Sequence, residues 1–288
     1  MTRRISLRAF AKINYALEVR GLRDDGYHEI SSVFQSISLA DELEIERTQG
    51  GFELFFEPEG VEVGPLEENT VYKAWASLWE ASGHELPVRI RLHKKVPAGA
   101  GLGGGSADAA AVLVGMNELF GLGLEVEDLR RIGTRIGADV PFCVSGGTAL
   151  GEGVGEILTP LPAPPEHRLL LAKPDRSADT GGIYRAHDRR QAPDKTCVEP
   201  VIAALHSGDL STFARAVGNV LEPVTADLVP EVAEYKREML RAGALAAAMT
   251  GTGTAVYGIF VDSETDEAPL RAPFVGACEP VGAGVVML

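Results

Sequence analysis

Hydrophobic and polar positions alternate along the N-terminal part of the chain. Ile13 and Leu17 share one parity and Lys12 lies on the other, and this period of two is typical of a strand with one buried face. Asp25 and Gly26 then favour a turn, after which SSVFQSISL and DELEIER alternate again. We expect antiparallel strands here, with Lys12 on the more polar face of the first one.

The pattern changes to a helical period in ENTVYKAWASLWEAS. Its apolar residues Val71, Ala74, Trp75 and Leu78 recur every three or four positions, which places them on one face of an amphipathic helix. The segment PVRIRLHKK returns to strand alternation and leads directly into a glycine-rich run, PAGAGLGGGS. The pattern therefore predicts a helix, a strand and then a loop.

Two more helices are predicted after the glycine run. Ser106 stands where an N-cap is expected, Asp108 falls in the first turn, and the apolar segment that follows ends at Gly121. The segment EVEDLRRIGTRIG indicates a second helix that ends at Gly137.

A proline-rich segment, TPLPAPPEHR, is the best candidate for a linker, because its four prolines cannot lie in a central strand or helix. Beyond it, strands are predicted at LLLAK, ALAAAMT, TAVYGIFV and near the C-terminus, and helices around CVEPVIAALHS, LSTFARAVG and VPEVAEYKREMLRAG. We expect an α+β protein with two domains, residues 1–160 and 161–288.

Composition excludes several classes of protein. A formal net charge of -14 disfavours binding to long nucleic acids or to an anionic membrane surface. No run of eighteen apolar residues occurs, and the three cysteines form no C-x-x-C pair. We expect a globular, cytoplasmic protein with no nucleic-acid partner, no membrane association, no disulfide framework and no zinc site.

The glycine run matches the pattern G-x-G-x-x-G from Gly99 to Gly104. The strand before it argues against a dinucleotide fold, because Arg89 and Arg91 alternate with apolar residues, whereas a doubly wound sheet buries both faces of its first strand. The Walker A pattern is absent, since no lysine follows Gly104 or Gly105.

Two interpretations of the glycine run remain. Its backbone N–H groups converge at the positive end of the helix that opens at Ser106, and such a site suits a polyphosphate. Alternatively, the glycines only let the helix and the sheet pack closely.

Other candidate residues also have structural alternatives. Asp139 precedes Val-Pro at the start of a new element and could be a plain helix cap, and the segment TGTGT beginning at Thr250 could be a hairpin turn. Taken alone, Lys12 reads as a solvated lysine, Tyr27 as a turn aromatic and His28 as an exposed histidine. No histidine has a partner at the spacing of a metal-binding pair.

Taken together, these segments resemble the GHMP kinases over nearly the whole chain. The matching stretches are FAKINYALEV, RDDGYHEISSVFQSISLADEL, PAGAGLGGGSADAAAVL, IGADVPF, SGGTALGEG and TGTGTAV. The pairing of AKIN with DGYHE is the specific part, because the glycine loop alone would indicate only the broader superfamily.

The resemblance implies a two-domain GHMP kinase fold, with an N-terminal domain like ribosomal protein S5 domain 2 and a ferredoxin-like C-terminal domain. It implies that ATP, with Mg²⁺, phosphorylates the C2 hydroxyl of 4-diphosphocytidyl-2-C-methyl-D-erythritol, giving the 2-phosphate and ADP on the non-mevalonate route to isoprenoid precursors. We therefore expect this small cytidine diphosphate compound and ATP as partners of a monomer or weak homodimer.

The resemblance also implies a role for each candidate site residue. Lys12 and Asp139 would be the catalytic pair, Asp139 accepting or orienting the hydroxyl proton and Lys12 keeping Asp139 ionised. The implied substrate contacts are Tyr27 and Tyr184, stacked on the cytosine, His28 at the base edge, and Asn14 and Thr180 near the rest of the substrate. The implied ATP contacts are Asn69, Lys94, Pro97, Ala98, Gly99, Ala100, Gly101, Leu102, Gly103, Gly104, Gly105, Ser106 and Ala107. Metal ligands stay open, because Ala107 stands where many relatives have a second serine.

Three rival functions remain at this point. Another GHMP kinase, acting on homoserine or mevalonate, would not need the DGYHE aromatics, because those substrates have no base to stack. A non-catalytic nucleotide-binding module would not need both Lys12 and Asp139. An RNA-binding S5-like domain would conflict with the acidic charge balance.

Overall fold

The computed structural model describes residues 4–58, 65–190, 196–261 and 270–288. In chain order its elements are β1 (Arg4–Leu22), β2 (His28–Arg47), β3 (Phe52–Glu57), the 3-10 turn η1 (Leu66–Glu68), α1 (Thr70–Ser82), β4 (Val88–His93), α2 (Gly104–Phe120), α3 (Val126–Thr134), α4 (Val140–Ser145), β5 (Thr148–Glu152), β6 (Ile157–Pro160), β7 (Arg168–Lys173), α5 (Thr180–Asp188), α6 (Val198–Ser207), α7 (Leu210–Ala216), β8 (Gly218–Asn219), α8 (Glu222–Leu228), α9 (Glu231–Arg241), β9 (Ala246–Met249), β10 (Val256–Phe260), β11 (Phe274–Cys278) and β12 (Val285–Met287).

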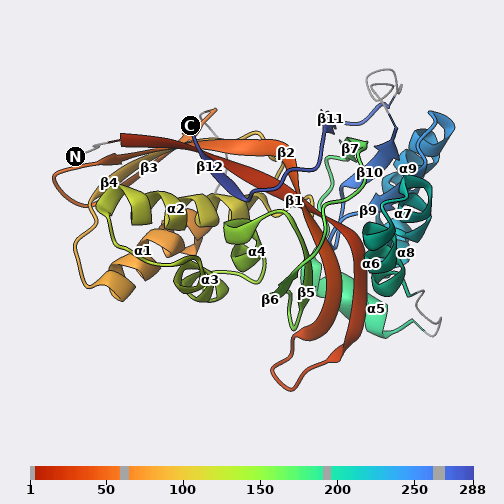
Figure 1. Cartoon of the computed structure of the whole chain (residues 1–288), viewed down its shortest axis with the longest axis horizontal. Coiled ribbons are helices and arrows are strands. Elements are labelled where there is room, and N and C mark those ends of the chain that lie inside the picture. The colour runs from red at the N-terminus through yellow and green to blue at the C-terminus, as the bar shows by residue number, and fades with distance from the viewer. Residues whose placement is uncertain (1–3, 59–64, 191–195, 262–269) are drawn as a thin grey trace.

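The first half of the molecule is a sheet with helices α1 to α4 on one side (Figure 1). Its main path runs β12, β1, β2, β4, β3, with β5 and β6 continuing from β2 and β8 beside β1. The long β1–β2 hairpin is antiparallel, as the alternating pattern predicts. In Figure 1 this hairpin curves away from the sheet and runs along the boundary between the two halves.

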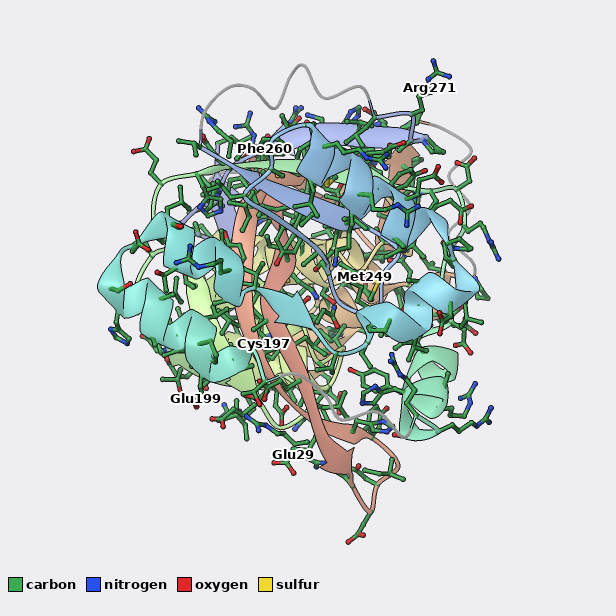
Figure 2. The ribbon with its side chains drawn as sticks, turned by 90° about the vertical axis from the view of Figure 1, so that its right-hand side faces the viewer. Glu29, Cys197, Glu199, Met249, Phe260 and Arg271 are labelled. Atoms are coloured by element: carbon green, nitrogen blue, oxygen red, sulfur yellow. The ribbon has the colours of Figure 1, made fainter. Side chains whose placement is uncertain are left out.

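The second half is a sheet of four strands in the order β11, β7, β10, β9, paired antiparallel throughout. Figure 2 looks at the molecule from this side, where the later helices lie in front of the strands and Glu29 marks the region of the hairpin tip. Together the two halves confirm the predicted α+β class. β12 returns from the second half and pairs with β1 of the first.

β1 is shared by the hydrophobic cores of both halves. Leu7 belongs to the core beneath the first sheet, Ile13 to the core that joins β1 to β7, α6 and α7, and Leu17 to the core around α8 and α9. A strand that is covered on both faces buries both parities, so Lys12 is only 4% exposed. The interpretation of Lys12 as a solvated lysine is therefore wrong, although its parity, shared with Asn14, does face polar groups.

The helix positions follow the sequence in part. The predicted apolar face of α1 is buried, and α2 ends at Gly121 in a left-handed cap, as expected. α2 begins earlier than predicted, however: Gly103 is the N-cap, Ser106 lies inside the first turn, and Asp108 lies beyond it and is buried. A glycine with positive φ can start a helix without a side-chain cap, which is why the serine signal misplaced this end.

No helix within the described ranges has the length and apolar character needed to cross a bilayer.

Gly146 ends α4 where β12 approaches, and it offers a test of this packing. Its φ is +67°, and an added methyl group would lie 1.9 Å from the backbone nitrogen of Gly284. We expect Gly146→Ala to lower the free energy of unfolding by about 3 kcal/mol, from left-handed strain and overpacking together. Gly121→Ala is a milder change, because Gly121 has a similar φ of +64° but lies in the left-handed helical region, with ψ of 44°, and no atom lies within 4 Å of an added methyl group, so it should cost only about 1 kcal/mol. Equal losses in urea denaturation would contradict the packing described.

Candidate active site

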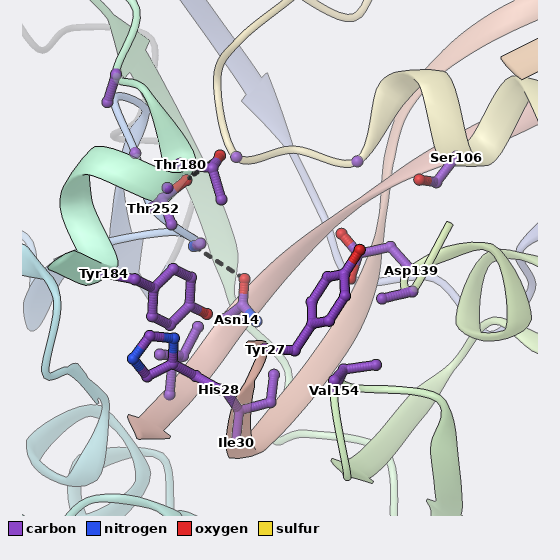
Figure 3. A pocket seen from close by; sticks show the side chains of 18 of the residues that line it. Asn14, Tyr27, His28, Ile30, Ser106, Asp139, Val154, Thr180, Tyr184 and Thr252 are labelled. Carbon is purple, nitrogen blue, oxygen red and sulfur yellow. Dashed lines mark hydrogen bonds between the residues drawn. The ribbon is translucent and has the colours of Figure 1, made fainter. Parts of the chain in front are cut away.

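A cavity of about 750 Å³ lies between the two halves. Eleven of the predicted site residues line it: Lys12, Asn14, Tyr27, His28, Gly99, Gly101, Gly103, Ser106, Asp139, Thr180 and Tyr184. Figure 3 shows Asp139 and Ser106 on one side of this space and Tyr184 and His28 on the other. Segments far apart in the sequence therefore meet at one place.

The charged centre of the cavity is an ion pair between Lys12 and Asp139. Lys12 Nζ lies 3.3 Å from Asp139 Oδ2 and donates a hydrogen bond of 3.0 Å to Asn14 Oδ1. Asp139 precedes α4, but its side chain makes no capping hydrogen bond to that helix. The plain helix-cap interpretation of Asp139 is wrong, and its carboxylate remains 32% exposed.

Asn14 connects this pair to both halves of the molecule. Its Nδ2 donates to Ser32 Oγ of β2 at 2.8 Å. Its Oδ1 accepts from the backbone nitrogen of Gly251 at 2.9 Å and from Thr250 Oγ1 at 3.1 Å. The segment TGTGT is thus a turn between the antiparallel strands β9 and β10 and also a wall of the cavity, so both interpretations of it hold.

The glycine loop contacts β1 and the second half through its backbone. Methyl groups at Gly101 and Gly103 would lie 2.3 Å from the Thr250 carbonyl oxygen and 2.9 Å from Lys12 Cγ, respectively. The backbone nitrogen of Lys12 donates to the carbonyl of Leu102 at 2.9 Å. Close packing therefore accounts for Gly101 and Gly103, as the interpretation of the glycine run as a packing feature predicts.

The same loop also presents backbone N–H groups to the cavity region. The first intrahelical hydrogen bond of α2 runs from the nitrogen of Ala107 to the carbonyl of Gly103, so the amides of residues 104–106 have no acceptor within the helix. Helix N-termini of this kind attract anions. Gly99, Gly101, Gly103 and Ser106 line the cavity, whereas Ala100, Leu102 and Ala107 are buried in the hydrophobic cores.

The two predicted ATP contacts outside the glycine loop, Asn69 and Lys94, do not line this cavity either. Asn69 caps α1 by accepting from the nitrogen of Val71 at 2.9 Å. Lys94 Nζ lies 2.5 Å from Asp41 Oδ2 and 2.7 Å from Asp108 Oδ2, beneath the start of α2. Burial, together with nearby Asp41, raises the pKa of Asp108 to about 8. Lys94 is thus held by two buried carboxyl groups, an interaction that sequence spacing could not show.

The opposite end of the cavity is aromatic. The rings of His28 and Tyr184 are stacked, with centroids 4.7 Å apart and planes inclined by 20°. The His28 side chain is only 9% exposed, so the exposed-histidine interpretation is wrong, whereas Tyr27 is 67% exposed. Burial raises the pKa of Tyr184 to about 12. Tyr184 can offer a ligand only the ring face that His28 leaves open.

Helix α5 supplies much of this end, and the sequence analysis did not predict it. Asp179 caps the helix by accepting from the nitrogen of Gly182 at 2.9 Å. An aspartate at this position favours the start of a helix, but the two glycines that follow Thr180 have low helix propensity. Thr180 contacts Thr252 of the opposite turn, with 3.2 Å between their hydroxyl oxygens. Lining residues to which the sequence assigned no role include Ile30, Phe34, Ala138, Val154, Arg185 and Asp188.

The described residues contain no group of three or more His, Cys, Asp and Glu side chains that could hold a metal ion. Mg²⁺ does not need such a cage, because it commonly binds through one or two carboxylates and the phosphates of its substrate. Asp139 and the hydroxyl of Ser106 are oxygen donors that line the cavity.

Family models and sequence relatives agree on what the chain resembles. Residues 69–147 match the model of the GHMP kinases N terminal domain, and residues 201–274 match that of the GHMP kinases C terminal. A 4-diphosphocytidyl-2-C-methyl-D-erythritol kinase from Moorella thermoacetica is 46% identical over 91% of this chain and 92% of its own length. Another, from Pelotomaculum thermopropionicum, is 44% identical over 91% of each chain.

Solved structures extend this agreement to the fold. A crystal structure of 4-(cytidine 5'-diphospho)-2C-methyl-D-erythritol kinase superposes with a TM-score of 0.82 at 34% identity, covering 97% of this chain and all of that one. A homoserine kinase from Cytophaga hutchinsonii gives a TM-score of 0.79 at 21% identity over 100% of this chain and 98% of its own, which shows the shared fold alone. The chain belongs to the GHMP kinase family, among the 4-diphosphocytidyl-2-C-methyl-D-erythritol kinases.

Proposed function

We propose that this chain transfers the γ-phosphoryl group of ATP to the C2 hydroxyl of 4-diphosphocytidyl-2-C-methyl-D-erythritol, giving the 2-phosphate and ADP on the non-mevalonate route to isoprenoid precursors. The relatives named above are named as kinases of 4-diphosphocytidyl-2-C-methyl-D-erythritol. The observation that supports it most is the Lys12–Asp139 pair, 3.3 Å apart, between a helix N-terminus and an aromatic cluster. One end of the cavity suits a phosphate chain and the other a base.

Asp139 is the base of the proposed reaction. A tertiary alcohol is a very weak acid, so its proton must pass to a positioned acceptor as the new bond to phosphorus forms. The Asp139 carboxylate is free of a capping role and lines the cavity. It would accept or orient this proton.

Lys12 stabilises negative charge at the reacting oxygen. Its ammonium group is buried, and an ammonium in a site with little water interacts more strongly with nearby charge than one in bulk solvent. Asn14 fixes the position of the ammonium through the 3.0 Å hydrogen bond. The pair therefore combines a proton acceptor with a fixed positive charge.

The loop from Pro97 to Ala107 would hold the phosphates of ATP through its backbone amides. Mg²⁺, brought with the nucleotide, would neutralise phosphate charge, with Asp139 and Ser106 as the available oxygen donors. Asn69 and Lys94 would support this loop from behind rather than reach the phosphates directly. Asn69 caps α1, whose first residue, Thr70, donates from Oγ1 to the carbonyl of Gly105 at 2.7 Å, and Lys94 bonds Asp108 of α2.

Tyr27, His28 and Tyr184 would bind the cytosine, and Asn14 and Thr180 would contact the rest of the substrate. We place the domain boundary at 160/161, where β6 ends within the proline-rich segment that leads to β7. Three buried cysteines, none of them in a disulfide within the described residues, fit a cytoplasmic enzyme, which we propose to be a monomer or weak homodimer.

The substrate assignment is tested by coupled ADP release with MgATP. We expect turnover with the cytidine diphosphate substrate and none above background with homoserine or mevalonate, because neither small alcohol fills the aromatic end of the cavity. Phosphorylation of homoserine without activity on the cytidine compound would overturn the assignment. Binding of ATP without release of ADP from any of these alcohols would instead indicate a non-catalytic module.

The role of Asp139 is tested by Asp139→Asn, which keeps the shape of the side chain and removes its basicity. We expect kcat to fall by about two orders of magnitude or more, with the Kd for ATP nearly unchanged by calorimetry. Asp209→Asn, at the N-cap of α7, is a matched control, because asparagine caps a helix as well as aspartate. A kcat for Asp139→Asn equal to that of the control would remove Asp139 from the mechanism.

The contact between the glycine loop and Lys12 is tested by Gly103→Ala. The methyl group would displace the Lys12 side chain, and a shift of about 1 Å in a catalytic group can cost on the order of a hundredfold in rate. Gly83→Ala has nearly the same φ, +66° against +68°, but no atom within 4 Å. We expect the control to keep its kcat while Gly103→Ala loses at least about tenfold. Equal kcat values in the two variants would show that this contact does not position Lys12.

A further inference from the structure

His28 and Asp188 form a contact that the proposed function does not use. His28 Nε2 lies 2.9 Å from Asp188 Oδ1 and 3.1 Å from Oδ2. Asp188 ends α5 and lines the cavity, while His28 begins β2. The contact therefore joins the β1–β2 hairpin to a helix of the second half of the chain.

This geometry decides which nitrogen of His28 carries the proton. An ionised carboxylate only accepts hydrogen bonds, so the nitrogen that faces it must be a donor. In neutral imidazole one nitrogen is a donor and the other an acceptor. With the proton on Nε2, Nδ1 of His28 becomes an acceptor.

The ring cannot turn freely to exchange its two nitrogens. Tyr184 is stacked against it at 4.7 Å, and the His28 side chain is largely buried. The neighbouring cation on α5, Arg185, is directed to Asp179, with a distance of 3.2 Å between Arg185 Nη2 and Asp179 Oδ2. Asp188 is thus bonded to His28, and Nδ1 is the nitrogen left for a ligand in the cavity.

We propose that Asp188 is a positioning residue for base recognition. By holding the proton of His28 on Nε2, it makes Nδ1 an acceptor for the exocyclic amino group of the pyrimidine. Uracil presents a carbonyl oxygen where cytosine presents this amino group. In the uridine analogue this oxygen would face Nδ1 of His28, and because both atoms are acceptors no hydrogen bond would form between them. The inference rests on the proposed function, because it assumes that the base of a cytidine diphosphate substrate binds at this end.

The first test needs no activity. Nitrogen-15 NMR of the imidazoles in the full chain, with His28 assigned through His28→Gln, should show Nε2 protonated and Nδ1 unprotonated at pH 8. In Asp188→Asn the side-chain amide can donate to Nε2, so the proton should move at least partly to Nδ1. A wild-type His28 protonated on Nδ1, or on both nitrogens, would overturn the proposal.

The second test measures discrimination between bases. We expect wild-type protein to favour the cytidine substrate over its uridine counterpart, and Asp188→Asn to reduce the ratio of their kcat/KM values by about tenfold, the effect of one hydrogen bond. The loss should appear mainly as a higher KM for the cytidine substrate, with kcat changed much less, because Lys12 and Asp139 are untouched.

Asp179→Asn is the matched control. It removes one negative charge from the start of the same helix, and its amide oxygen can still cap the helix and accept from Arg185. Asp179 is not among the residues that line the cavity. It should keep the wild-type base preference. Equal preferences in Asp188→Asn and Asp179→Asn would refute the role of Asp188, whereas absence of turnover in wild-type protein with either base would refute the proposed function instead.

Discussion

The close approach of the glycine loop to β1 and to the turn between β9 and β10 is the contact on which the site depends. Gly101 lies against the carbonyl of Thr250, and Gly103 lies against the side chain of Lys12. Any side chain at these positions would separate the start of α2 from β1. The backbone proposed to bind phosphate therefore also fixes the distance between the helix N-terminus and the Lys12–Asp139 pair. The packing interpretation and the anion-binding interpretation of the glycine run are thus compatible.

Two buried lysines illustrate how partners decide what an ammonium group can do. Burying a charge is costly unless it is paired. Lys94 has two buried carboxyl groups within 2.7 Å, those of Asp41 and Asp108, and these contacts direct its ammonium group away from a ligand in the cavity. Lys12 has one carboxylate, Asp139, which is itself partly exposed, and one amide oxygen from Asn14. Its field therefore extends into the cavity, where charge would develop during phosphoryl transfer.

The sequence predicted the α+β class, the long hairpin and the apolar face of α1 because each depends on local periodicity. It misjudged Lys12, because alternation reports one covered face and cannot show that a second half of the chain covers the other. It also missed α5, since two glycines following Thr180 lower helix propensity while the cap from Asp179 and contacts across the cavity restore it. Eleven predicted residues line one cavity. The predictions for Asn69 and Lys94 came from their positions in the family motif. A motif position cannot show that Asp41 and Asp108 lie beneath the loop and bind Lys94.

The strand β1 joins the residues proposed for catalysis to those proposed for base recognition. It carries Lys12 and Asn14, and its continuation through the hairpin carries Tyr27 and His28. The partners of these residues, Thr250 and Tyr184, come from the second half. Neither end of the cavity is complete within one half, so a shift of the halves would disturb the charged pair and the aromatic end together. An acidic protein can therefore hold a polyphosphate and a base in a fixed relation without a basic surface, because the few groups that matter are positioned by a shared strand rather than by net charge.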